Sequence, residues 1–599
     1  MRMPVFASAT PRGWIACGLA AIGIGLLPVV LDDAFFILVA QSLAYLFIVA
    51  LGLDILVGWT GQISLGHAGL FAASAYTSAL LSTRLGFPFW ISAPLGVAAA
   101  AGMGMLLALP SLRAKGPYLA MVTVAFGFMV EVTANRWDLT GGPMGIMAIP
   151  FPRLPNGREL TPAEYFWLVG GVALVCQVAA SNLFRSRIGR TLFALRGSEI
   201  AAETVGVDVY RYKVLAFVVS SVYAGIGGVF FAHQNGFINS DTFVFALSVS
   251  FLTSVLMGGA GTLFGPLVGS TILNLIPTVF AKLHEYHLYI YGGIILGVIV
   301  FLPKGIVGSL LATRALQRLR PAPPAVVPDR TPLGAAFPAP KGEPIVEITG
   351  LGRSFGGVRA LSQVDVRVTG GEVHGLIGPN GSGKSTFVNV LTGLYKPSAG
   401  SIRLGGVEVG GQSPHRMARL GVTRTFQSIR LFGDLSVLDN VMVGFHIHLR
   451  RGFLAHLLQT RGAVEEEARY RGRALALLEL VGIAERAHEL AQNLSYGQQR
   501  LLEIARALAV APRVLLLDEP AAGINPTELN GLARIIRAIQ AVGITQVVIE
   551  HHMGLIMGIS DTITVLDFGQ KIAEGTAEQI QRDPKVIEAY LGTQEAQHA

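Results

Sequence analysis

Long apolar runs dominate the first half of the chain, and short apolar runs alternate with polar segments in the second half. A helix needs about 20 apolar residues to cross the hydrocarbon core of a bilayer. The runs predict ten membrane spans, near residues 14–31, 35–57, 65–83, 89–109, 117–134, 163–183, 214–234, 243–259, 264–281 and 287–302. Residues 58–69 (GWTGQISLGHAG) are rich in Gly and polar residues and favour a broken or re-entrant segment, which needs protein or water around it. A count of eight or nine spans therefore stays open.

The first apolar run follows a short leader that carries Arg2 and Arg12. It admits two interpretations, a cleaved signal peptide and an uncleaved first span. The run is long for a signal sequence, no Ala-x-Ala site follows it, and further apolar runs come at once. An uncleaved first span is therefore expected.

Basic residues predict the orientation of the spans. Six Arg and Lys residues lie between residues 184 and 213, two more lie at Arg113 and Lys115, and further ones follow the last span. With ten spans, all three groups fall on one side, which the positive-inside rule assigns to the cytoplasm. Both termini are then expected in the cytoplasm, and the loop 135–162 outside.

The hydrophobic pattern changes after a proline-rich stretch. Residues 321–344 hold eight prolines in 24 positions, which predicts an extended tether and not a helix or strand. Beyond it, helical stretches opening at Ser385 and near 464–481 are interspersed with strand-like runs at 345–351, 364–368, 373–378, 401–406, 514–518, 545–550 and 562–569. The expected architecture is an all-α polytopic membrane domain over 1–320, a linker over 321–344 and an α/β domain over 345–599.

Composition supports this division of the 599 residues. The chain is 52% hydrophobic and only 14% charged, against about 25% charged in soluble domains. The first 320 residues hold 31 charged residues and the remaining 279 hold 53, while the net charge of +8 divides as +7 and +1. These values exclude a wholly soluble enzyme and a disordered chain, and the basic excess fits membrane orientation better than nucleic-acid binding. Cys17 and Cys176 lie in apolar runs and are expected to be packing residues.

The strongest motif is a phosphate-binding loop. The segment GPNGSGKST matches G-x-x-x-x-G-K-[ST] and lies between a strand-like run and a helical stretch, as the motif requires. Backbone N–H groups and the helix N-terminus would cradle phosphates, the lysine would reach the β- and γ-phosphates, and the serine hydroxyl would ligate Mg²⁺. The predicted nucleotide-binding residues here are Gly378, Pro379, Asn380, Gly381, Ser382, Gly383, Lys384, Ser385 and Thr386.

A second motif, VLLLDEP, ends a strand-like run in two carboxylates. Asp518 is placed to hold Mg²⁺, and Glu519 is placed to polarise an attacking water as a general base. A strand ending in Asp-Glu is by itself a common structural feature. Its position downstream of a phosphate-binding loop favours the catalytic interpretation.

A third motif, LSYGQQR, precedes that strand. Ser495 is expected to cap a helix beginning near Gly497, and the N-terminus of such a helix can meet a phosphate. Taken alone, the segment is an ordinary helix start.

The order of these motifs, with a histidine in VVIEHH after them, resembles the ATPase domain of ABC transporters over about residues 345–592. The resemblance implies roles for further residues. Phe355 is similar to the aromatic residue that stacks on adenine, and Gln427 in RTFQ is similar to the glutamine that senses Mg²⁺ and touches the permease. His551 resembles the histidine that contacts the γ-phosphate. The signature residues that would bind the γ-phosphate held by the opposite subunit are Ser495, Gly497 and Gln498.

Two positions depart from the commonest ABC pattern. Tyr496 stands where LSGGQ has its first glycine, and Asn525 stands where many members have aspartate. Asn525 keeps hydrogen-bonding capacity and loses the charge, so its coupling role is open.

Longer matches narrow the resemblance to importers of branched-chain (hydrophobic) amino acids. LSYGQQRLLEIARAL and LDEPAAGINP resemble their ATPase subunit, while residues 51–76, 112–128, 140–146, 188–217 and 301–308 resemble their permease subunit. The resemblance implies a permease fused to its ATPase in a bacterial cytoplasmic (inner) membrane, with ATP and Mg²⁺ as cofactors. It also implies a second permease and a second ATPase, or a homodimer, and an external solute-binding protein; nucleic acid is not an expected partner.

Some predictions concern coupling and the membrane interior. The segment 197–206 is the expected coupling helix that docks near Gln427, against the alternative of a solvated loop. Asp54, His67 and Glu131 are ionisable residues within predicted spans, where such groups are costly and often functional. Glu131 either faces the solute pathway or bonds to backbone or Arg136.

Other functions stay open at this level. Related importers take other amino acids, urea or short amides. An exporter half-transporter has six long spans, which the compact loops here disfavour. A mechanical signalling complex needs a large external domain, and a soluble nucleic-acid ATPase is excluded by the membrane half.

Overall fold

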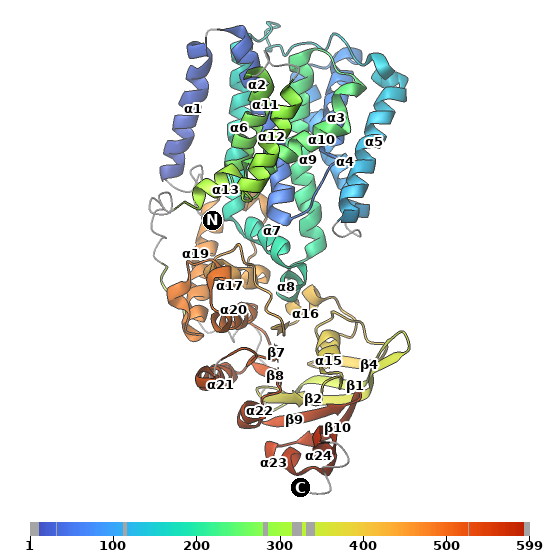
Figure 1. Ribbon diagram of the computed structural model, residues 1–599, viewed down its shortest axis with the longest axis vertical. Coiled ribbons are helices and arrows are strands. Elements are labelled where there is room, and N and C mark those ends of the chain that lie inside the picture. The colour runs from blue at the N-terminus through green and yellow to red at the C-terminus, as the bar shows by residue number, and fades with distance from the viewer. Residues whose placement is uncertain are drawn as a thin grey trace.

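The computed structural model describes residues 11–31, 33–111, 117–279, 286–313, 326–330, 342–524 and 526–591. Its first half is a bundle of helices, and its second half is an α/β unit below one end of that bundle (Figure 1). The predicted fold class is therefore confirmed.

Ten helices of the bundle coincide with the ten predicted spans. They are α1 (Pro11–Leu31), α2 (Ala34–Thr60), α3 (His67–Arg84), α4 (Phe89–Ser111), α5 (Pro117–Arg136), α6 (Pro162–Arg185), α9 (Val209–Asn235), α10 (Phe245–Gly258), α11 (Gly265–Val279) and α12 (His287–Phe301). Within the described residues, six segments are long and apolar enough to cross a membrane by themselves: Ala34–Thr60, Phe89–Leu109, Tyr118–Arg136, Pro162–Arg185, Val209–Asn235 and Ser240–Gly258. The number of complete spans is therefore six or more.

The predicted break after the second span is present. Helix α2 ends at Thr60, Gly61 caps it with a left-handed backbone (φ 72°), and α3 begins only at His67. Gly61 can adopt this conformation because it has no Cβ. Of the six non-helical residues between the two helices, Gln62, Ser64 and Gly66 are buried, as irregular backbone at membrane depth requires, while Gly61 and Ile63 are exposed.

Helix α2 forms the centre of the bundle and packs against α6, α9, α10 and α11. Its second half is buried on all sides, and Ile48, Leu51, Leu53 and Trp59 have no exposed surface. Gly52 lies directly against Tyr223 of α9, where a Cβ would overlap the tyrosine side chain. Small residues allow this close approach of helices, which is how membrane helices gain packing energy.

Short helices leave the bundle at one end. They are α7 (Arg187–Gly197) and α8 (Glu199–Thr204), between α6 and α9, and α13 (Gly305–Leu311) after α12. Both ends of the α5–α6 connection lie at the opposite end of the bundle, and there it contains η1 (Asp138–Thr140) and η2 (Gly142–Met144) (Figure 1). The connection 184–213 and the α/β unit are thus on the same side, as the basic residues predict.

The α/β unit contains two sheets. An antiparallel sheet has the order β2-β1-β4-β5, and a six-stranded sheet has the order β10-β9-β3-β8-β7-β6, parallel except for the β9–β10 pair. The strands are β1 (Pro344–Phe355), β2 (Val358–Thr369), β3 (Val373–Ile377), β4 (Ala399–Leu404), β5 (Val407–Glu408), β6 (Val422–Arg424), β7 (Val514–Asp518), β8 (Thr545–Ile549), β9 (Thr562–Asp567) and β10 (Gln570–Gly575). Seven of these strands coincide with the predicted runs: β3, β7, β8 and β9 are buried apolar segments of the largely parallel sheet, and β1, β2 and β4 lie in the antiparallel sheet.

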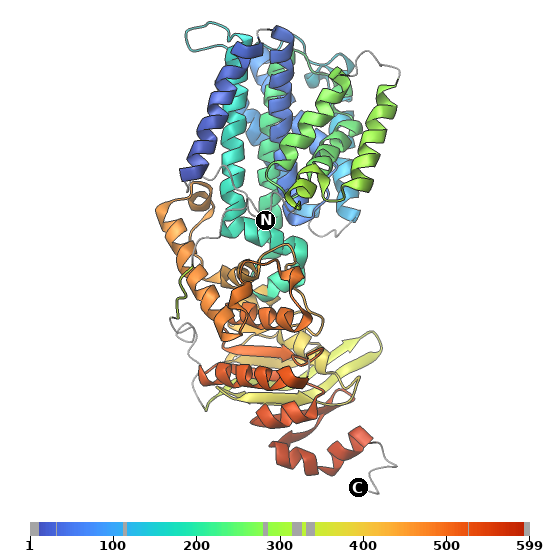
Figure 2. The same cartoon turned by 60° about the vertical axis from the view of Figure 1, so that its left-hand side comes forward.

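Helices of the α/β unit lie between these sheets and the membrane bundle and around the sheets (Figure 2). They are α15 (Lys384–Leu391), α16 (Pro414–Arg419), α17 (Val437–Gly444), α18 (Phe453–Leu457), α19 (Arg461–Leu480), α20 (Tyr496–Leu508), α21 (Pro526–Ala541), α22 (Met553–Ile559), α23 (Ala577–Arg582) and α24 (Pro584–Leu591). Helix α15 opens one residue before the predicted Ser385, and α19 covers the predicted amphipathic run. Helices α16, α17 and α18 contact α6, α7 and α8, and α19 lies at the same end of the unit, close to the bundle (Figure 1).

Candidate nucleotide site and coupling interface

The phosphate-binding loop connects the end of β3 to the start of α15. Gly378 (φ 151°) and Gly383 (φ 99°) adopt backbone conformations that favour glycine, and a Cβ on Gly378 would overlap the carbonyl of Leu566. Helix α15 therefore begins at Lys384 with its N-terminal amides facing the loop. This arrangement is suited to hold an anion.

Lys384 folds back across this loop. Its Nζ donates to the carbonyls of Gly378 (2.7 Å) and Pro379 (2.9 Å) and to the Ser382 hydroxyl (3.4 Å). Burial lowers the pKa of Lys384, while Glu519 and Asp518 oppose that shift. Of the other predicted loop residues, Asn380, Gly381 and Ser385 are exposed, while Gly383 and Thr386 are partly exposed. The Lys384 ammonium group and the N-terminal amides of α15 thus lie at the same loop.

Asp518 lies at the end of β7 in a buried ion pair that the sequence motifs did not reveal. Its Oδ2 accepts from Nη2 of Arg424 at 2.9 Å, and both side chains are 5% exposed. Arg424 also donates to Oδ1 of Asn389 at 2.6 Å, and the Asp518 amide donates to the hydroxyl of Thr425 at 3.1 Å. Burial raises the pKa of Asp518, and Arg424 opposes this. Arg424 therefore fixes the orientation of the carboxylate.

Glu519, Gln427 and His551 meet beside Asp518. The Glu519 Oε1 accepts from Nε2 of Gln427 at 2.9 Å and lies 3.0 Å from Nε2 of His551. Glu519 has a left-handed backbone (φ 49°), and its amide donates to the carbonyl of Ile549 on β8. A non-glycine residue in this conformation is often found at functional sites. The three predicted catalytic residues thus come together from three separate segments.

The predicted adenine-stacking residue lies at the end of β1. Phe355 is 39% exposed and meets Tyr395 edge-on, with ring centroids 5.2 Å apart. The Arg353 guanidinium lies 4.5 Å from the Phe355 centroid on the ring face. The Phe355 ring is therefore held in place by Tyr395 and partly exposed to solvent, with the Arg353 guanidinium over its face.

The signature segment opens helix α20 as predicted, with a capping box. The Ser495 hydroxyl accepts from the Gln498 amide, and the Gln498 side chain accepts from the Ser495 amide. Gly497 and Gln498 line a cavity of about 600 Å³ together with Leu501. Among the described residues, no hydrogen bond or ion pair joins this segment to the phosphate-binding loop. Asn525 lies outside the described residues.

The Tyr496 ring occupies the space beside Gly523, in the turn that follows Glu519. A Cβ on Gly523 would lie 2.5 Å from Cε1 of Tyr496. The tyrosine that replaces the usual glycine thus packs within its own chain and leaves Gly497 available. Although Tyr496 departs from the commonest signature, helix α20 still begins there with its capping box.

Similarity to known proteins identifies both halves of the chain. The family described as "Branched-chain amino acid transport system / permease component" matches residues 35–302, "ABC transporter" matches 361–522, and "Branched-chain amino acid ATP-binding cassette transporter" matches 570–596. The chain belongs to the branched-chain amino acid ABC transporter family. It is a permease fused to an ATP-binding component, and its ATPase region binds nucleotide.

Curated relatives match one half each. The ATP-binding protein BraF of Pseudomonas aeruginosa is 46% identical over 250 residues, which are 42% of this chain and 98% of BraF. LivG of Escherichia coli K12 is 43% identical over 251 residues, covering 42% of this chain and 98% of LivG. The permease LivM of Escherichia coli K12 is 34% identical over 283 residues, covering 43% of this chain and 67% of LivM. LivG and LivM are separate proteins, and this single chain contains a region similar to each of them.

In this transporter, α20 holds the segment from Phe426 to Arg430, which contains Gln427. Arg500 donates to the carbonyls of Phe426 and Gln427, the latter at 2.8 Å, and Arg506 donates to the carbonyl of Arg430 at 2.7 Å. Glu503 lies between the two arginines, and all three α20 side chains are buried. No sequence motif predicted this network; its signal is the i, i+3 spacing of Arg500, Glu503 and Arg506 on one helix face.

The predicted coupling segment docks on the ATPase region. Gly197 lies against Phe432, five residues after Gln427, and Gly206 lies against Ile447. Helix α8 packs on α16, and Arg196 of α7 donates to the Gly58 carbonyl at 2.6 Å and lies 4.0 Å from Asp434. The segment therefore contacts both the membrane bundle and the ATPase region, which is what coupling requires.

Helix α7 adds a buried ion pair to this interface. The Arg190 guanidinium binds both carboxylate oxygens of Glu467 on α19, with one bond at 2.8 Å. Although burial disfavours the ionised carboxylate, Arg190 and Arg471 hold the pKa of Glu467 below its ordinary value. Arg190 is 5% exposed and Glu467 17%, so the pair is largely removed from water.

Two of the three ionisable residues predicted within spans have structural contacts. Asp54 is buried and accepts from the Gly261 amide at 2.6 Å, which ties α2 to the α10–α11 turn. His67 is buried between the hydroxyls of Ser64 (3.0 Å) and Ser220 (2.7 Å). Glu131 is partly exposed, and no described residue forms a hydrogen bond or ion pair with it, Arg136 included. Cys17 is partly exposed and Cys176 is buried, and both are free thiols.

Proposed function

We propose that this chain takes up branched-chain amino acids, or closely related ones, across the bacterial cytoplasmic membrane. The family shows an ATP-driven importer, and the relatives named for branched-chain amino acids match both halves. The observation that carries the proposal is the contact of α7 with the segment that follows Gln427, beside the packing of α8 on α16. This contact links the nucleotide site to the membrane bundle within one chain.

The division of labour follows the proposed domains. Residues 1–320 form the permease, 321–344 the linker and 345–599 the ATPase. The change from apolar helices to two sheets supports these boundaries. Because an ABC site combines the phosphate-binding loop of one ATPase with the signature of another, a second ATPase and a second permease complete the transporter.

In the proposed site, the phosphate-binding loop and Lys384 bind the phosphates, and Phe355 supports the adenine. Ser495, Gly497 and Gln498 serve the nucleotide held by the opposite ATPase. The inward-facing lysine and the exposed aromatic ring support these roles. The nucleotide thereby brings the two ATPase regions together.

The residues beside this loop fit a magnesium ion. Mg²⁺ prefers oxygen ligands and usually combines one or two protein ligands with water and substrate phosphates. Ser385, Asp518 and Gln427 offer such oxygens, and among the described residues no group of three or more His, Cys, Asp or Glu forms a closed metal cage. When bound, the ion would neutralise charge on the phosphates.

Glu519 acts as general base in the proposed hydrolysis. Its carboxylate orients the attacking water and takes its proton, while His551 contacts the γ-phosphate and Gln427 reports the state of the site to the coupling segment. The shared hydrogen bonds of these three side chains support this assignment. Opening and closing of the site would then move the segment that holds Phe432.

Uptake by the reconstituted transporter tests the proposal. The chain is assembled with its partner permease and ATPase in vesicles, a candidate solute-binding protein is added, and ATP-dependent uptake of radiolabelled leucine, isoleucine and valine is measured beside urea. We expect saturable uptake of the branched-chain amino acids that excess unlabelled leucine abolishes. Uptake of urea alone, or ATP-dependent export, would overturn the proposed solute or direction.

A further inference from the structure

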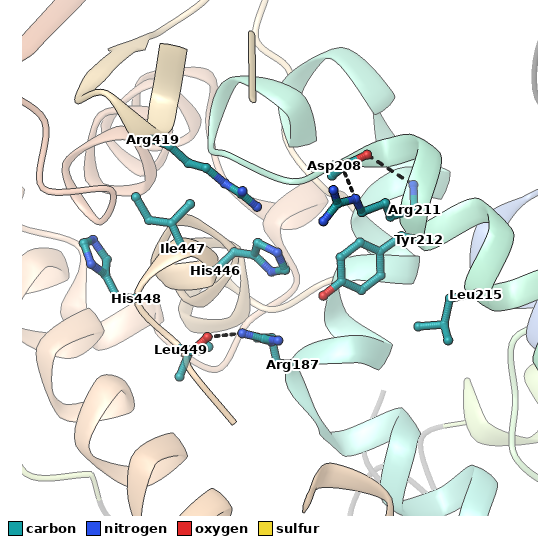
Figure 3. Close-up of a pocket in the computed structure, with 10 residues that line it drawn as sticks. All are labelled: Arg187, Asp208, Arg211, Tyr212, Leu215, Arg419, His446, Ile447, His448 and Leu449. Atoms are coloured by element: carbon teal, nitrogen blue, oxygen red, sulfur yellow. Dashed lines mark hydrogen bonds and ion pairs between the residues drawn. The ribbon is translucent and has the colours of Figure 1, made fainter. Parts of the chain in front are cut away.

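A cavity of about 700 Å³ lies where the coupling helices meet the ATPase region. Its wall is built from two sides, as Figure 3 shows: Arg187, Arg211 and Tyr212 come from α7 and α9, while Arg419 and His446 come from α16 and the turn after α17. None of the catalytic residues proposed above lines it. The cavity is therefore distinct from the nucleotide site.

Positive charge predominates in this cavity. Three arginines line it, and Asp208 is its single lining carboxylate. Asp208 is already engaged, because it lies 3.0 Å from Nε of Arg211 and also caps α9. Within the described part of the chain, neither Arg187 nor Arg419 pairs with a carboxylate. Two guanidinium groups from opposite sides of the interface thus have uncompensated charge.

The surroundings of Arg187 favour an anion and not another cation. Its guanidinium donates to the Leu449 carbonyl, while its Nε is buried without a hydrogen-bond partner. An unpaired buried donor is costly, and an anion that accepts from it removes the cost. His446 is buried beside Arg187 and Arg419, and burial together with these arginines lowers its pKa to about 3. His446 therefore stays neutral and does not add to the repulsion.

We propose that this cavity binds a phosphate-bearing anion that bridges Arg187 of the coupling helix to Arg419 of the ATPase region. Planar guanidinium groups bind phosphate oxygens through paired N–H donors, which suits this ligand class. The anion would draw α7 and α16 together and stabilise the docked interface. Because the cavity lies at the N-terminal end of α9, where this bundle helix meets the ATPase region, the phosphate can belong either to an anionic lipid headgroup or to a soluble ion or ester.

Thermal unfolding of the full chain in a neutral detergent tests the proposal, with two arms. All variants carry Lys384→Ala, which weakens phosphate binding in the nucleotide site. One arm compares inorganic phosphate with sodium chloride at equal ionic strength, and the other compares phosphatidylglycerol with phosphatidylcholine. We expect at least one anion to raise the unfolding midpoint by a few degrees, because a ligand of the folded state stabilises it. A shift in the lipid arm alone assigns a headgroup, and a shift with inorganic phosphate assigns a soluble source.

Matched variants connect any shift to this cavity. Arg187→Gln/Arg419→Gln should raise the half-saturating anion concentration by about 100-fold, since each of the two charge-assisted contacts is worth about a factor of ten. Arg419→Gln alone changes an exposed side chain and should give a smaller loss without disturbing the fold. Arg416→Gln, an exposed α16 residue bonded to Gln412, is the control and should keep the full response. The proposal is overturned if neither anion shifts the midpoint, or if both arginine variants respond like the control.

Discussion

Glu519 is the residue on which hydrolysis is expected to depend most. Its carboxylate accepts from Gln427 and contacts His551, so it is held at the position where a water would be polarised. Replacing it with glutamine keeps the shape and the hydrogen bond but removes the base. We expect Glu519→Gln to retain ATP binding and to lower turnover by about 100-fold or more, as the loss of a general base does. Phosphate release by the assembled transporter measures this, and unchanged turnover would refute the assignment.

Arg424 is a second residue with a specific expected effect, because it neutralises Asp518 in a buried pair. Arg424→Met should leave Asp518 without a partner and lower the free energy of unfolding by about 3–5 kcal/mol. The control is Arg403→Met, which removes an exposed pair to Glu408 at 4.0 Å and should cost about 1 kcal/mol or less. Urea unfolding of the full chain compares them. If both variants lower the free energy of unfolding equally, the buried Arg424–Asp518 pair contributes no more to stability than the exposed Arg403–Glu408 pair.

Among individual residues, those within contiguous motifs could be predicted from the sequence. Residues whose partners are distant along the chain could not. Lys384, Asp518 and Glu519 follow apolar strands within recognisable patterns, so local order alone predicts them. Arg424 sits only three residues before Gln427, yet its partner Asp518 is 94 positions further on. Such a pairing depends on the parallel register of β6 and β7, which spacing along the chain does not specify.

Helix α20 provides a prediction at the scale of the element. Its capping box satisfies amides that the helix would otherwise leave open, and α23 begins with the same device at Thr576 and Gln579. We expect Ser495→Ala and Thr576→Ala each to lower the free energy of unfolding by about 1 kcal/mol. Only Ser495→Ala should also reduce ATP hydrolysis, because its helix start carries the signature.

The comparison uses urea unfolding and ATP turnover of the two variants in the assembled transporter. Because the stability cost is matched, a loss of turnover confined to Ser495→Ala reports function and not general damage. If both variants keep the turnover of the unmodified protein, Ser495 is only a helix cap. If both lose the same share of turnover, the loss follows from the lower stability.

Elements were predictable where periodicity was strong. The long apolar runs predicted the ten long helices of the bundle, and short strand-like runs predicted seven strands. Helix α7 was not predicted, and α8 was expected only as part of a coupling segment over 197–206, because helices of 11 and 6 residues carry little periodic signal. Their position depends on contacts with Phe432 and Ile447, which belong to the other half of the chain.

At the scale of the whole molecule, the Arg190–Glu467 pair joins the membrane bundle to the ATPase region. Removing the carboxylate would leave the buried Arg190 unpaired and weaken docking by about 3 kcal/mol. We expect Glu467→Gln to lower the fraction of ATP hydrolysis that depends on solute while leaving ATP binding unchanged. The control is Glu489→Gln, which removes an exposed pair to Arg486 within the ATPase region. Solute-stimulated and basal turnover are compared in vesicles, and an unchanged ratio would contradict the role of this pair.

Helix α7 has a mechanical consequence for this molecule. It contains 11 residues and is therefore a rod about 16 Å long. Arg190 anchors it to α19 near one end, and Arg196 at the other end holds the Gly58 carbonyl just before the break between α2 and α3. A tilt of about 10° in such a rod displaces one end by about 3 Å relative to the other. A small rotation of the ATPase region would thus reach the central helix as a lateral pull, at the point where its regular backbone stops.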